Sequence, residues 1–255
     1  RLGSDVSFLT LIGDDNFGEM GINLWKEEKI NAYFSRIKKP TGTAFIYLEK
    51  KQNNNAIMVN NGAAKEISAN FVQKETKNII SSSVFLTQLE QPLDAAIKGL
   101  EIAKKNNVIT ILNPAPALKL KKEVLELCDF LTPNETEAEK LTGIKVNCYE
   151  SAKKAIKILQ SYGCSNVIIT MGEKGAVLGE IDKKISIIKS FKIGKTVDTS
   201  GAGDCFNGAL AYSLSNNQNT IESVKFACKS AGFSVTKEGT SMSMPKLNEI
   251  LHIKT

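Results

Sequence analysis

Apolar and polar residues follow two periods along the chain, one typical of buried strands and one typical of helices that face a core. Residues 6–12 form an apolar run ending at Gly13-Asp14-Asp15, and residues 17–30 then repeat apolar residues at helical spacing. Further strands are predicted at residues 84–89, 108–112, 130–131 and 167–170, and further helices at 93–105, 121–127, 134–141, 149–162, 202–215 and 221–236. Strands separated by helices pair in parallel, so we expect an α/β fold with a mostly parallel sheet covered on both faces.

Two hairpins interrupt this alternation. Residues 43–50 and 56–60 are strand-like and are joined by the polar stretch Lys51-Gln52-Asn53-Asn54-Asn55. This hairpin, within residues 41–60, is either a small sheet that serves as a lid or dimer contact, or an ordinary surface hairpin. Residues 176–179 and 185–188 form the second pair.

Length and composition place the chain among globular proteins. Its 255 residues, 42% of them hydrophobic, fit one large α/β domain or one domain with a small appendage. No apolar run reaches the roughly 20 residues that span a bilayer, and the first residues do not resemble a signal peptide. The five cysteines are widely spaced and lack a Cys-x-x-Cys pair, so we expect reduced packing residues in a cytoplasmic protein without membrane association.

The charged residues exclude several function classes. The net charge is +6, but Arg1 and Arg36 are the only arginines, whereas nucleic-acid readers usually rely on arginine. We therefore expect no nucleic-acid partner, and a lysine-rich surface that weakly attracts anions such as nucleotides. His252 is the only histidine, which argues against His-based triads and metal sites. In an enzyme of this composition, carboxylates must carry the proton chemistry.

One stretch combines an anion site with an acid. Two glycines and an alanine precede an apolar run of helical spacing in Asp198-Thr-Ser-Gly201-Ala202-Gly203-Asp204. The amides of Gly201 to Asp204 would point outward at a helix N-terminus, where anions bind. An aspartate there has the wrong sign for binding phosphate, and its alternative role is to favour the helix dipole. We interpret Asp204 as a base that deprotonates a nucleophile attacking phosphorus.

Other polar groups follow the predicted strands, at the sheet edge where ligands gather. They are Gln88-Leu89-Glu90, Asn113-Pro-Ala-Pro-Ala and Pro133-Asn134-Glu-Thr-Glu137. Glu90 could accept hydrogen bonds from hydroxyl groups, and Asn134 and Glu137 could share a helix face and hold a hydrated Mg²⁺. Alternatively, Asn134 and Glu137 form only a capping box at a helix start.

Three glycine-bearing loops were compared as phosphate sites. Thr170-Met-Gly172-Glu-Lys-Gly175 follows a strand and could approach a nucleotide, although such a loop alone is more often a tight turn. Gly194-Lys-Thr ends like a P-loop, but position 189 is Lys instead of the required Gly. Gly201-x-Gly203 lacks the small residue that a dinucleotide fingerprint needs, because Phe206 stands there. Neither a P-loop enzyme nor an NAD enzyme is indicated.

These motifs together resemble the PfkB family of carbohydrate kinases and, within it, the ribokinase branch. The C-terminal motif is Asp198-Thr-Ser-Gly-Ala-Gly-Asp204-Cys-Phe-Asn-Gly-Ala-Leu, and the branch is indicated by Asn113-Pro-Ala-Pro-Ala and by residues 133–143. The similarity runs over essentially all of the chain. It implies a three-layer sandwich with a mostly parallel central sheet and a β-sheet lid, near residues 41–60, that pairs with a second subunit in a homodimer.

The resemblance also implies a reaction and its site residues. ATP would phosphorylate D-ribose to ribose 5-phosphate, with Asp204 as base and the amides of Gly201, Ala202 and Gly203 as anion hole. Glu90 would bind the sugar, Asn134 and Glu137 the Mg²⁺-phosphate region, and Thr170 and Gly172 the nucleotide. An activating K⁺ would lie beside the anion hole, held by residues Asp198, Ser200, Ser234, Lys237, Gly239 and Ser243.

The start of the family pattern is not found in this sequence. The pattern opens with a strand carrying an Asp for the sugar, a lid segment and a Gly-Gly-Lys-Gly-x-Asn stretch, whereas Arg1-Leu-Gly-Ser matches the segment after them. The sequence is thus expected to be a truncated form or a piece of a longer chain lacking the N-terminal strand, with poor stability and weak or absent activity alone. Alternative functions are another PfkB-type sugar or nucleoside kinase, or a catalytically impaired nucleotide-binding relative.

Overall fold

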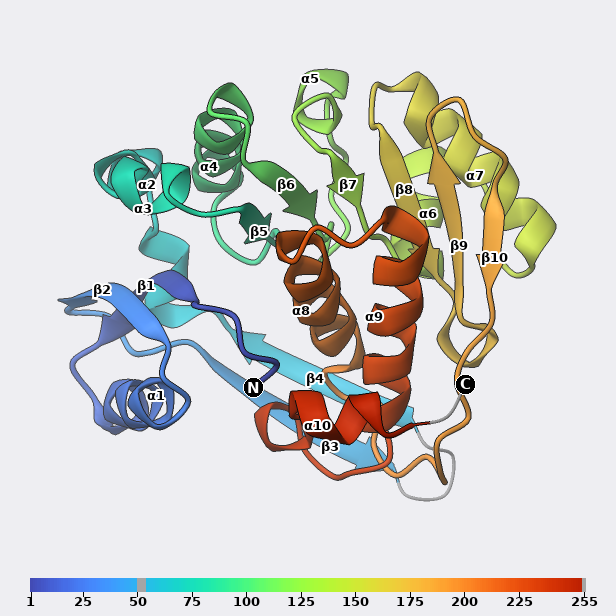
Figure 1. The fold of residues 1–255 in the computed structure, drawn as a ribbon. Helices are drawn as coiled ribbons and strands as arrows, with labels where there is room; N and C mark the ends of the chain where they lie inside the picture. Colours follow the sequence, from blue (N-terminus) through green and yellow to red (C-terminus); the bar gives the residue numbers. More distant parts are fainter. Residues whose placement is uncertain (50–53, 254–255) are drawn as a thin grey trace.

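The centre of the fold is a six-stranded sheet with the order β10-β9-β8-β7-β6-β5. The structure is a computed structural model that describes residues 1–49 and 54–253 (Figure 1). The strands are β5 (Val84–Thr87), β6 (Ile109–Leu112), β7 (Phe130–Leu131), β8 (Asn166–Thr170), β9 (Ala176–Glu180) and β10 (Ser186–Ile188). Neighbouring strands from β5 to β8 are parallel, whereas β9 and β10 form an antiparallel hairpin at one edge. The predicted mostly parallel sheet is confirmed.

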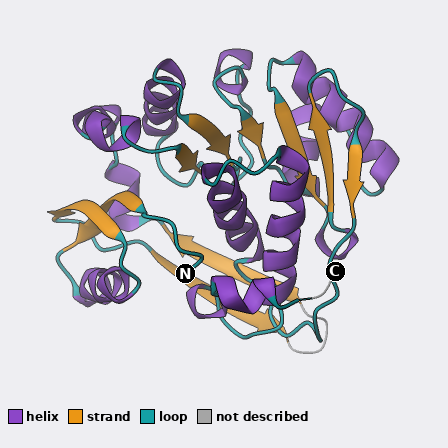
Figure 2. Cartoon of the chain, viewed as in Figure 1, coloured by secondary structure: helices purple, strands orange, loops and turns teal. Residues whose placement is uncertain are grey.

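Helices cover both faces of this sheet, which gives the predicted three layers (Figure 2). One face carries α4 (Leu93–Lys105), α5 (Lys122–Leu125), α6 (Glu135–Thr142) and α7 (Tyr149–Ser161), and the other carries α8 (Ala202–Ser215) and α9 (Thr220–Ser234). The bounds of α4 and α8 coincide with the predicted ranges: α4 has a clear apolar periodicity and begins after Pro92, whereas α8 is a largely apolar run that begins after Gly201.

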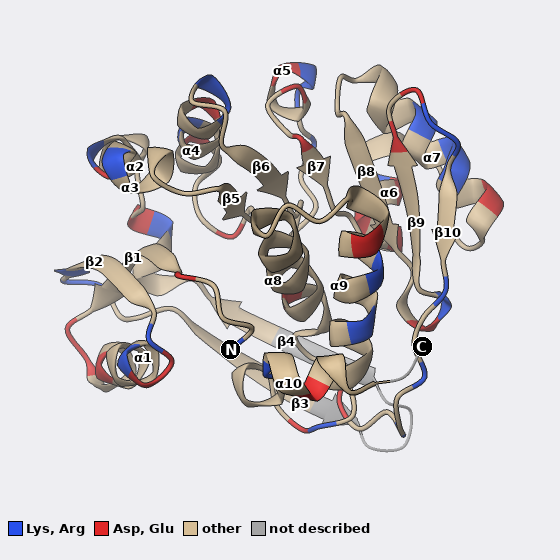
Figure 3. Ribbon diagram, viewed as in Figure 1, with Lys and Arg blue, Asp and Glu red and all other residues tan. Residues whose placement is uncertain are grey.

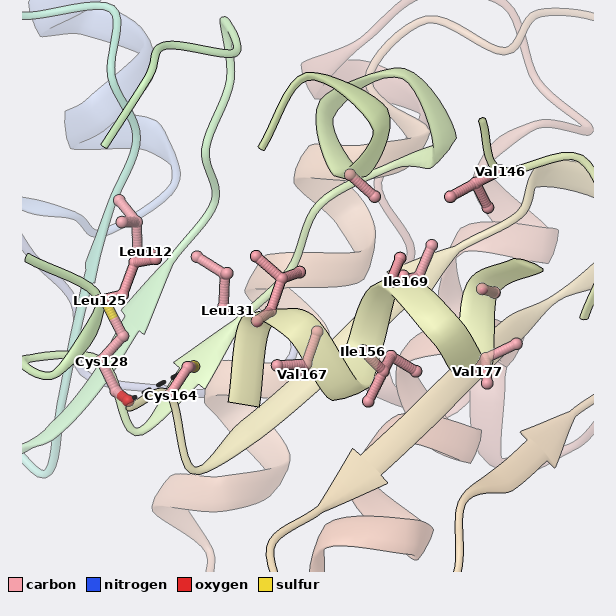
Figure 4. Packing of buried hydrophobic residues seen from close by; sticks show 14 of the residues in the cluster. Leu112, Leu125, Cys128, Leu131, Val146, Ile156, Cys164, Val167, Ile169 and Val177 are labelled. Carbon is pink, nitrogen blue, oxygen red and sulfur yellow. Dashed lines mark hydrogen bonds between the residues drawn. The ribbon is translucent and has the colours of Figure 1, made fainter. Parts of the chain in front are cut away.

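Alternate side chains of each strand point to opposite layers and divide the core in two. Leu112 and Leu131 pack under α4 to α7, whereas their neighbours Ile111 and Phe130 pack under α8 and α9. Figure 4 shows the first of these clusters, in which Ile156 of α7 packs near the strand residues. Both clusters consist of buried apolar side chains, and their packing on the two faces fixes the positions of the carboxyl ends of the strands.

A separate two-stranded sheet lies beside the main one. It consists of β1 (Ser7–Gly13) and β2 (Asn31–Ile37), which pair in parallel around α1 (Asn16–Glu27). The rings of Phe8 and Trp25 meet with centroids 5.2 Å apart and join β1 to α1. Within the described ranges, β1 pairs only with β2 and β5 only with β6, so each has one free edge. The sequence reading did not predict β2.

The predicted hairpin of residues 41–60 is a small antiparallel sheet, β3 (Thr43–Glu49) and β4 (Asn54–Asn60). The predicted connection is residues 51–55: its residues 51–53, like residue 50, lie outside the described residues, whereas Asn54 and Asn55 pair with β3 and extend the second strand beyond the predicted range 56–60. Asp15, at the start of α1, fixes the entry to this sheet: its carboxylate accepts hydrogen bonds from the Thr41 amide at 2.7 Å and from the Thr41 hydroxyl at 2.6 Å. These two hydrogen bonds fix where the chain enters the β3–β4 sheet.

Several short elements complete the chain. They are η1 (Gly62–Glu66), α2 (Ala69–Lys74), α3 (Thr76–Ile80), η2 (Gly172–Lys174), η3 (Ser241–Ser243) and α10 (Leu247–Leu251). No helix in the described part of the chain is long and apolar enough to cross a membrane.

Surface charge is mixed on the outer helices. Figure 3 shows basic and acidic residues interspersed on α4, α5 and α7, where ion pairs such as Lys98–Glu101 and Lys153–Glu150 form. Many lysines therefore lie beside carboxylates, as expected of a solvated face. Cys148 is exposed, whereas the other four cysteines are buried.

Candidate active site

Asp204 lies in the first turn of α8, a helix that begins directly after a glycine in the left-handed conformation. Gly201 is the N-cap of α8 and has φ +74°, a conformation that glycine adopts without strain. A Cβ at Gly203 would meet no atom within 4 Å, so the backbone beside Asp204 is bare and open. The predicted glycine-rich turn before a helix N-terminus is thus present, with the acid at its end.

The amides of this turn are not equivalent. The Ala202 amide donates a hydrogen bond to the Thr199 carbonyl at 3.2 Å. The amides of Gly203 and Asp204 lie within the first turn, where a helix provides no carbonyl of its own one turn earlier. The positive end of the α8 dipole adds to their attraction for an anion. An anion approaching the open side of Gly203 would meet these donors first.

The Asp204 carboxylate is held by a side chain from the end of β5. Oδ1 of Asp204 accepts a hydrogen bond from Nε2 of Gln88 at 2.9 Å. Although Asp204 keeps contact with solvent, the surrounding protein displaces water from its carboxylate and raises the pKa of Asp204, and the Gln88 hydrogen bond partly offsets this rise. The carboxylate is therefore a stronger proton acceptor than an ordinary aspartate.

Glu90 lies close to Asp204, as the strand-end rule predicts. Burial raises the pKa of Glu90, and the nearby charge of Asp204 raises it further. Nδ2 of Asn61, at the exit of the β3–β4 sheet, donates to the Glu90 carbonyl at 2.9 Å and so connects the lid to this edge of the site. Two carboxylates, one beside open backbone amides, can together bind and deprotonate a hydroxyl compound.

Asn134 and Glu137 form the capping box that the sequence allowed as an alternative. Oδ1 of Asn134 accepts from the Glu137 amide at 2.8 Å, and the Glu137 carboxylate accepts from the Asn134 amide at 2.8 Å and from its Nδ2 at 3.0 Å. Burial raises the pKa of Glu137. Carboxylate oxygens have further lone pairs, so the pair can still hold waters of a hydrated cation.

Thr170 and Gly172 lie at the neighbouring strand end. Thr170 ends β8 and forms an isolated parallel bridge with Asn134, which brings two of the predicted nucleotide residues together. Gly172 has φ +51°, and a Cβ there would meet no atom within 4 Å. The open glycine backbone thus lies directly beyond the Asn134 turn.

Three of the residues predicted to hold a monovalent cation, Asp198, Ser200 and Gly239, are hydrogen-bonded together. The Asp198 carboxylate accepts from the amides of Ser200 at 2.8 Å and Gly239 at 3.0 Å, which joins the turn before α8 to the turn after α9. Burial disfavours the charged carboxylate, but these hydrogen bonds outweigh it and lower the pKa of Asp198. Ser234 and Ser243 are buried, with exposed fractions of 1% each. The donor set is rich in oxygen and carries one negative charge.

Three polar residues lie beside the site with hydrogen-bond partners that only the structure reveals. Asn113 was expected at a strand end without a role, and Thr132 and Asn207 were not singled out. All three are buried and hydrogen-bonded to one another or to Gln88. Their partners are far apart in sequence, so no local spacing could have indicated them. No cluster of three or more His, Cys, Asp or Glu suited to a metal occurs among the residues with described positions.

Comparison with known proteins supports the same interpretation. The profile described as "pfkB family carbohydrate kinase" matches residues 1–247. A ribokinase of Haemophilus influenzae is 39% identical over 253 residues, which cover 98% of this chain and 82% of that protein. A deoxyribokinase of Salmonella typhi is 34% identical, with 98% and 81% covered. Arabidopsis thaliana ribokinase, solved with ribose and ATP, superposes with a TM-score of 0.89 at 26% identity, covering 97% of this chain and 81% of that one.

Proposed function

The chain belongs to the pfkB family of carbohydrate kinases, and we propose that it transfers the γ-phosphoryl group of ATP to D-ribose, giving ribose 5-phosphate. The observation that carries this proposal is the position of Asp204: a carboxylate with raised pKa, beside bare backbone amides at a helix N-terminus and close to Glu90. Relatives named ribokinase match nearly the whole chain and support ribose as the sugar.

In the proposed reaction Asp204 accepts the proton of the terminal sugar hydroxyl as that oxygen attacks the γ-phosphorus. A carboxylate that is partly desolvated and fixed by Gln88 loses little freedom when it accepts this proton. Gly201, Ala202 and Gly203 are assigned to the anion hole. Of their amides, that of Ala202 already donates to the Thr199 carbonyl, so we assign developing negative charge to the amides of Gly201 and Gly203.

Asn134, Thr170 and Gly172 are proposed to hold the nucleotide, with Glu137 in the Mg²⁺ region. The oxygen donors of the capping box suit a cation that keeps most of its waters and binds chiefly to phosphates. Bound with ATP, Mg²⁺ would neutralise phosphate charge. The raised pKa of Glu137 would fall on approach of a cation, which would keep this carboxylate ionised.

We assign a K⁺ site to the turns before α8 and after α9. Its residues are Asp198, Ser200, Ser234, Lys237, Gly239 and Ser243. The proximity of these turns and the buried Asp198 carboxylate support the assignment. A cation there would add positive charge behind the amides that face the phosphate, without touching the substrate.

Glu90 is proposed to bind sugar hydroxyl groups as an acceptor. A carboxylate acceptor fits any polyol, so the site alone does not separate ribose from related sugars. The similarity to a relative named deoxyribokinase favours 2-deoxyribose as the alternative substrate.

We propose that the β3–β4 sheet pairs with that of a second copy. Phe45, Tyr47 and Met58 share one face of this sheet and are exposed by 69%, 65% and 75%. Three large apolar side chains on a two-stranded sheet are typical of an interface, because an isolated sheet of two strands is marginally stable.

The substrate is tested with the full-length protein, ATP, Mg²⁺ and K⁺, by following ADP release with ribose, 2-deoxyribose, fructose and adenosine in turn. We expect the highest kcat/KM for ribose. A higher kcat/KM for 2-deoxyribose or adenosine would identify that compound, instead of ribose, as the substrate. No ADP release with any of the four compounds would refute the kinase proposal.

A further inference from the structure

A chain of amide and hydroxyl groups, buried except at half-buried Gln88, connects the Asp204 carboxylate to the backbone of its own helix turn. It begins at Gln88 and passes through Asn113, Thr132 and Asn207, side chains that come from the ends of β5, β6 and β7 and from α8. Asn113, Thr132 and Asn207 are exposed by only 8%, 1% and 4%. Buried polar groups need partners, and here they find them in one another.

Each link is a direct hydrogen bond. Gln88 uses both hydrogens of Nε2, donating to Asp204 Oδ1 at 2.9 Å and to Asn113 Oδ1 at 3.0 Å. Asn113 Nδ2 donates to the Thr132 carbonyl at 2.9 Å, and the Thr132 hydroxyl donates to Asn207 Oδ1 at 2.6 Å. Asn207 Nδ2 donates to the Gly203 carbonyl at 2.9 Å. The chain therefore returns to the peptide that joins Gly203 to Asp204.

The ionised carboxylate fixes the orientation at its end of this chain. An ionised Asp204 can only accept, so Gln88 must present its Nε2. Asn113 must then present its oxygen to Gln88, which turns its Nδ2 toward the Thr132 carbonyl. At the other end, the Gly203 carbonyl requires Nδ2 of Asn207, whose oxygen then faces the Thr132 hydroxyl. Each nitrogen or hydroxyl donor atom of the chain thus has an acceptor when Asp204 is ionised.

The backbone on both sides of the chain is also fixed. The Asn113 amide donates to the Thr87 carbonyl at 3.0 Å, and the Leu89 amide donates to the Ala115 carbonyl at 2.9 Å. Gln88 thus extends from a rigid strand end rather than a free loop. A donor held this way restricts the rotation of the carboxylate that it binds.

We infer that Gln88 is a positioning residue for the Asp204 carboxylate, and that Asn113, Thr132 and Asn207 connect it to the first turn of α8. The inference rests on the proposed role of Asp204 as base. Gln88 contacts neither reacting atom: it holds the carboxylate in one rotamer and favours its ionised form, while Asn207 holds the turn that carries the open amides.

The charged and titratable groups around Asp204 define what a pH measurement reports. Glu90, after β5, lies close enough for the Asp204 charge to raise its pKa. Cys205, next to Asp204 on α8, has a pKa raised to about 11 by burial and stays a neutral thiol in the useful range. Gln88 itself does not titrate, so its replacement changes the environment of Asp204 without adding a titrating group.

The test compares Gln88→Met with Gln73→Met, an exposed glutamine of α2 whose side chain donates only to Thr76. We expect Gln88→Met to lower kcat for ribose about tenfold to a hundredfold, as for a lost hydrogen bond to a charged group, with unchanged ATP affinity. Without the Gln88 donor the pKa of Asp204 rises, so the acid limb of kcat/KM moves to higher pH. Gln73→Met should show neither effect. Equal kcat and pH profiles for both variants would overturn the inference.

Two further measurements keep the inference separate from the proposed function. Thr132→Val removes the hydroxyl that binds Asn207 and should lower kcat in the same direction, whereas Thr132→Ser keeps that hydroxyl and should restore it. Titration of the ¹³C-labelled Asp204 carboxyl by NMR needs no turnover. If the wild type phosphorylates no sugar but Gln88→Met raises the Asp204 pKa in this titration, the proposed function fails and the positioning role stands. An unchanged titration would overturn the role directly.

Discussion

At the scale of one residue, Asp204 combines two properties that a proton acceptor in phosphoryl transfer needs. Its carboxylate is partly desolvated, which raises its pKa, and Gln88 limits that rise and fixes its orientation. Its position beside the open backbone of Gly203 places the base next to the group that would receive phosphate charge.

The raised pKa leads to a prediction about pH. A protonated Asp204 cannot accept the hydroxyl proton, so activity falls as the pH drops through its folded-state pKa. Because burial raises that pKa, we expect the acid limb of kcat/KM for ribose to lie above the ordinary aspartate range. A pH–rate profile of the wild type at saturating ATP measures it. An acid limb at or below the ordinary range would contradict the assigned environment of Asp204.

The sequence allowed the proximity of Glu90 and Asp204 to be predicted, but not the side chains that hydrogen-bond around Asp204. Glu90 and Asp204 stand next to a predicted strand end and a predicted helix start, where simple rules place ligands. Gln88 and Asp204 are 116 residues apart, and Thr132 and Asn207 are 75 residues apart. Their hydrogen bonds depend on the order of the strands, which the sequence pattern does not specify.

At the scale of the element, the first turn of α8 uses its two glycines for different purposes. Gly201 is the left-handed N-cap. A Cβ added there would lie 3.3 Å from Cε of Met244 and 3.3 Å from Cβ of Thr240, so this position is tightly packed. Gly203 is helical, and a Cβ there would point into open space. The first glycine therefore serves the fold and the second leaves room for a ligand.

This difference predicts opposite effects of two alanine substitutions. Gly201→Ala should lower the free energy of unfolding by about 1–2 kcal/mol, the usual penalty for a left-handed non-glycine residue. Gly203→Ala should leave the free energy of unfolding unchanged or raise it by up to about 1 kcal/mol, because alanine favours the helix, yet it should reduce turnover by obstructing the phosphate.

Urea unfolding and initial rates of both variants measure these effects. Full turnover by Gly203→Ala would show that the bare backbone is not needed for phosphate. Undiminished stability of Gly201→Ala would contradict the packing assigned to the N-cap.

Elements with strong periodicity were predicted well, and those formed by tertiary contacts were missed. α4 and α7 bury one face on the sheet, so their pattern is visible in the sequence. β2 has mostly exposed residues and no alternation, since it is held by backbone pairing with β1. The short helices α2, α3 and α10 have too few turns for a period to emerge.

At the scale of the whole molecule, the three layers fix the active-site edge while the β3–β4 sheet stands apart. Two core clusters on opposite faces of the central sheet set the positions of the strand ends, and Asp15 anchors the lid at Thr41. The exposed apolar face of the β3–β4 sheet is the surface that we propose contacts a second copy.

The proposed dimer predicts a specific loss of association. Phe45→Lys places a charge at the centre of the apolar lid face and should convert a dimer into a monomer, measured by sedimentation equilibrium. Ile181→Lys is the matched control, because Ile181 is 56% exposed but lies after β9, away from the lid. A wild-type protein that is monomeric throughout, or a Phe45→Lys variant that still dimerises, would refute the lid interface.

The central claim is that Asp204 is the base in phosphorylation of ribose. The most direct test measures transfer of the labelled γ-phosphoryl group of ATP to ribose by the full-length wild type, by Asp204→Asn and by the control Asp182→Asn. Asp182 is an exposed turn residue with a φ of +57°, a conformation that asparagine tolerates. We predict labelled ribose 5-phosphate with the wild type and the control, and a loss of about a hundredfold to ten-thousandfold with Asp204→Asn at unchanged ATP affinity. Transfer by Asp204→Asn at the wild-type rate would contradict this assignment.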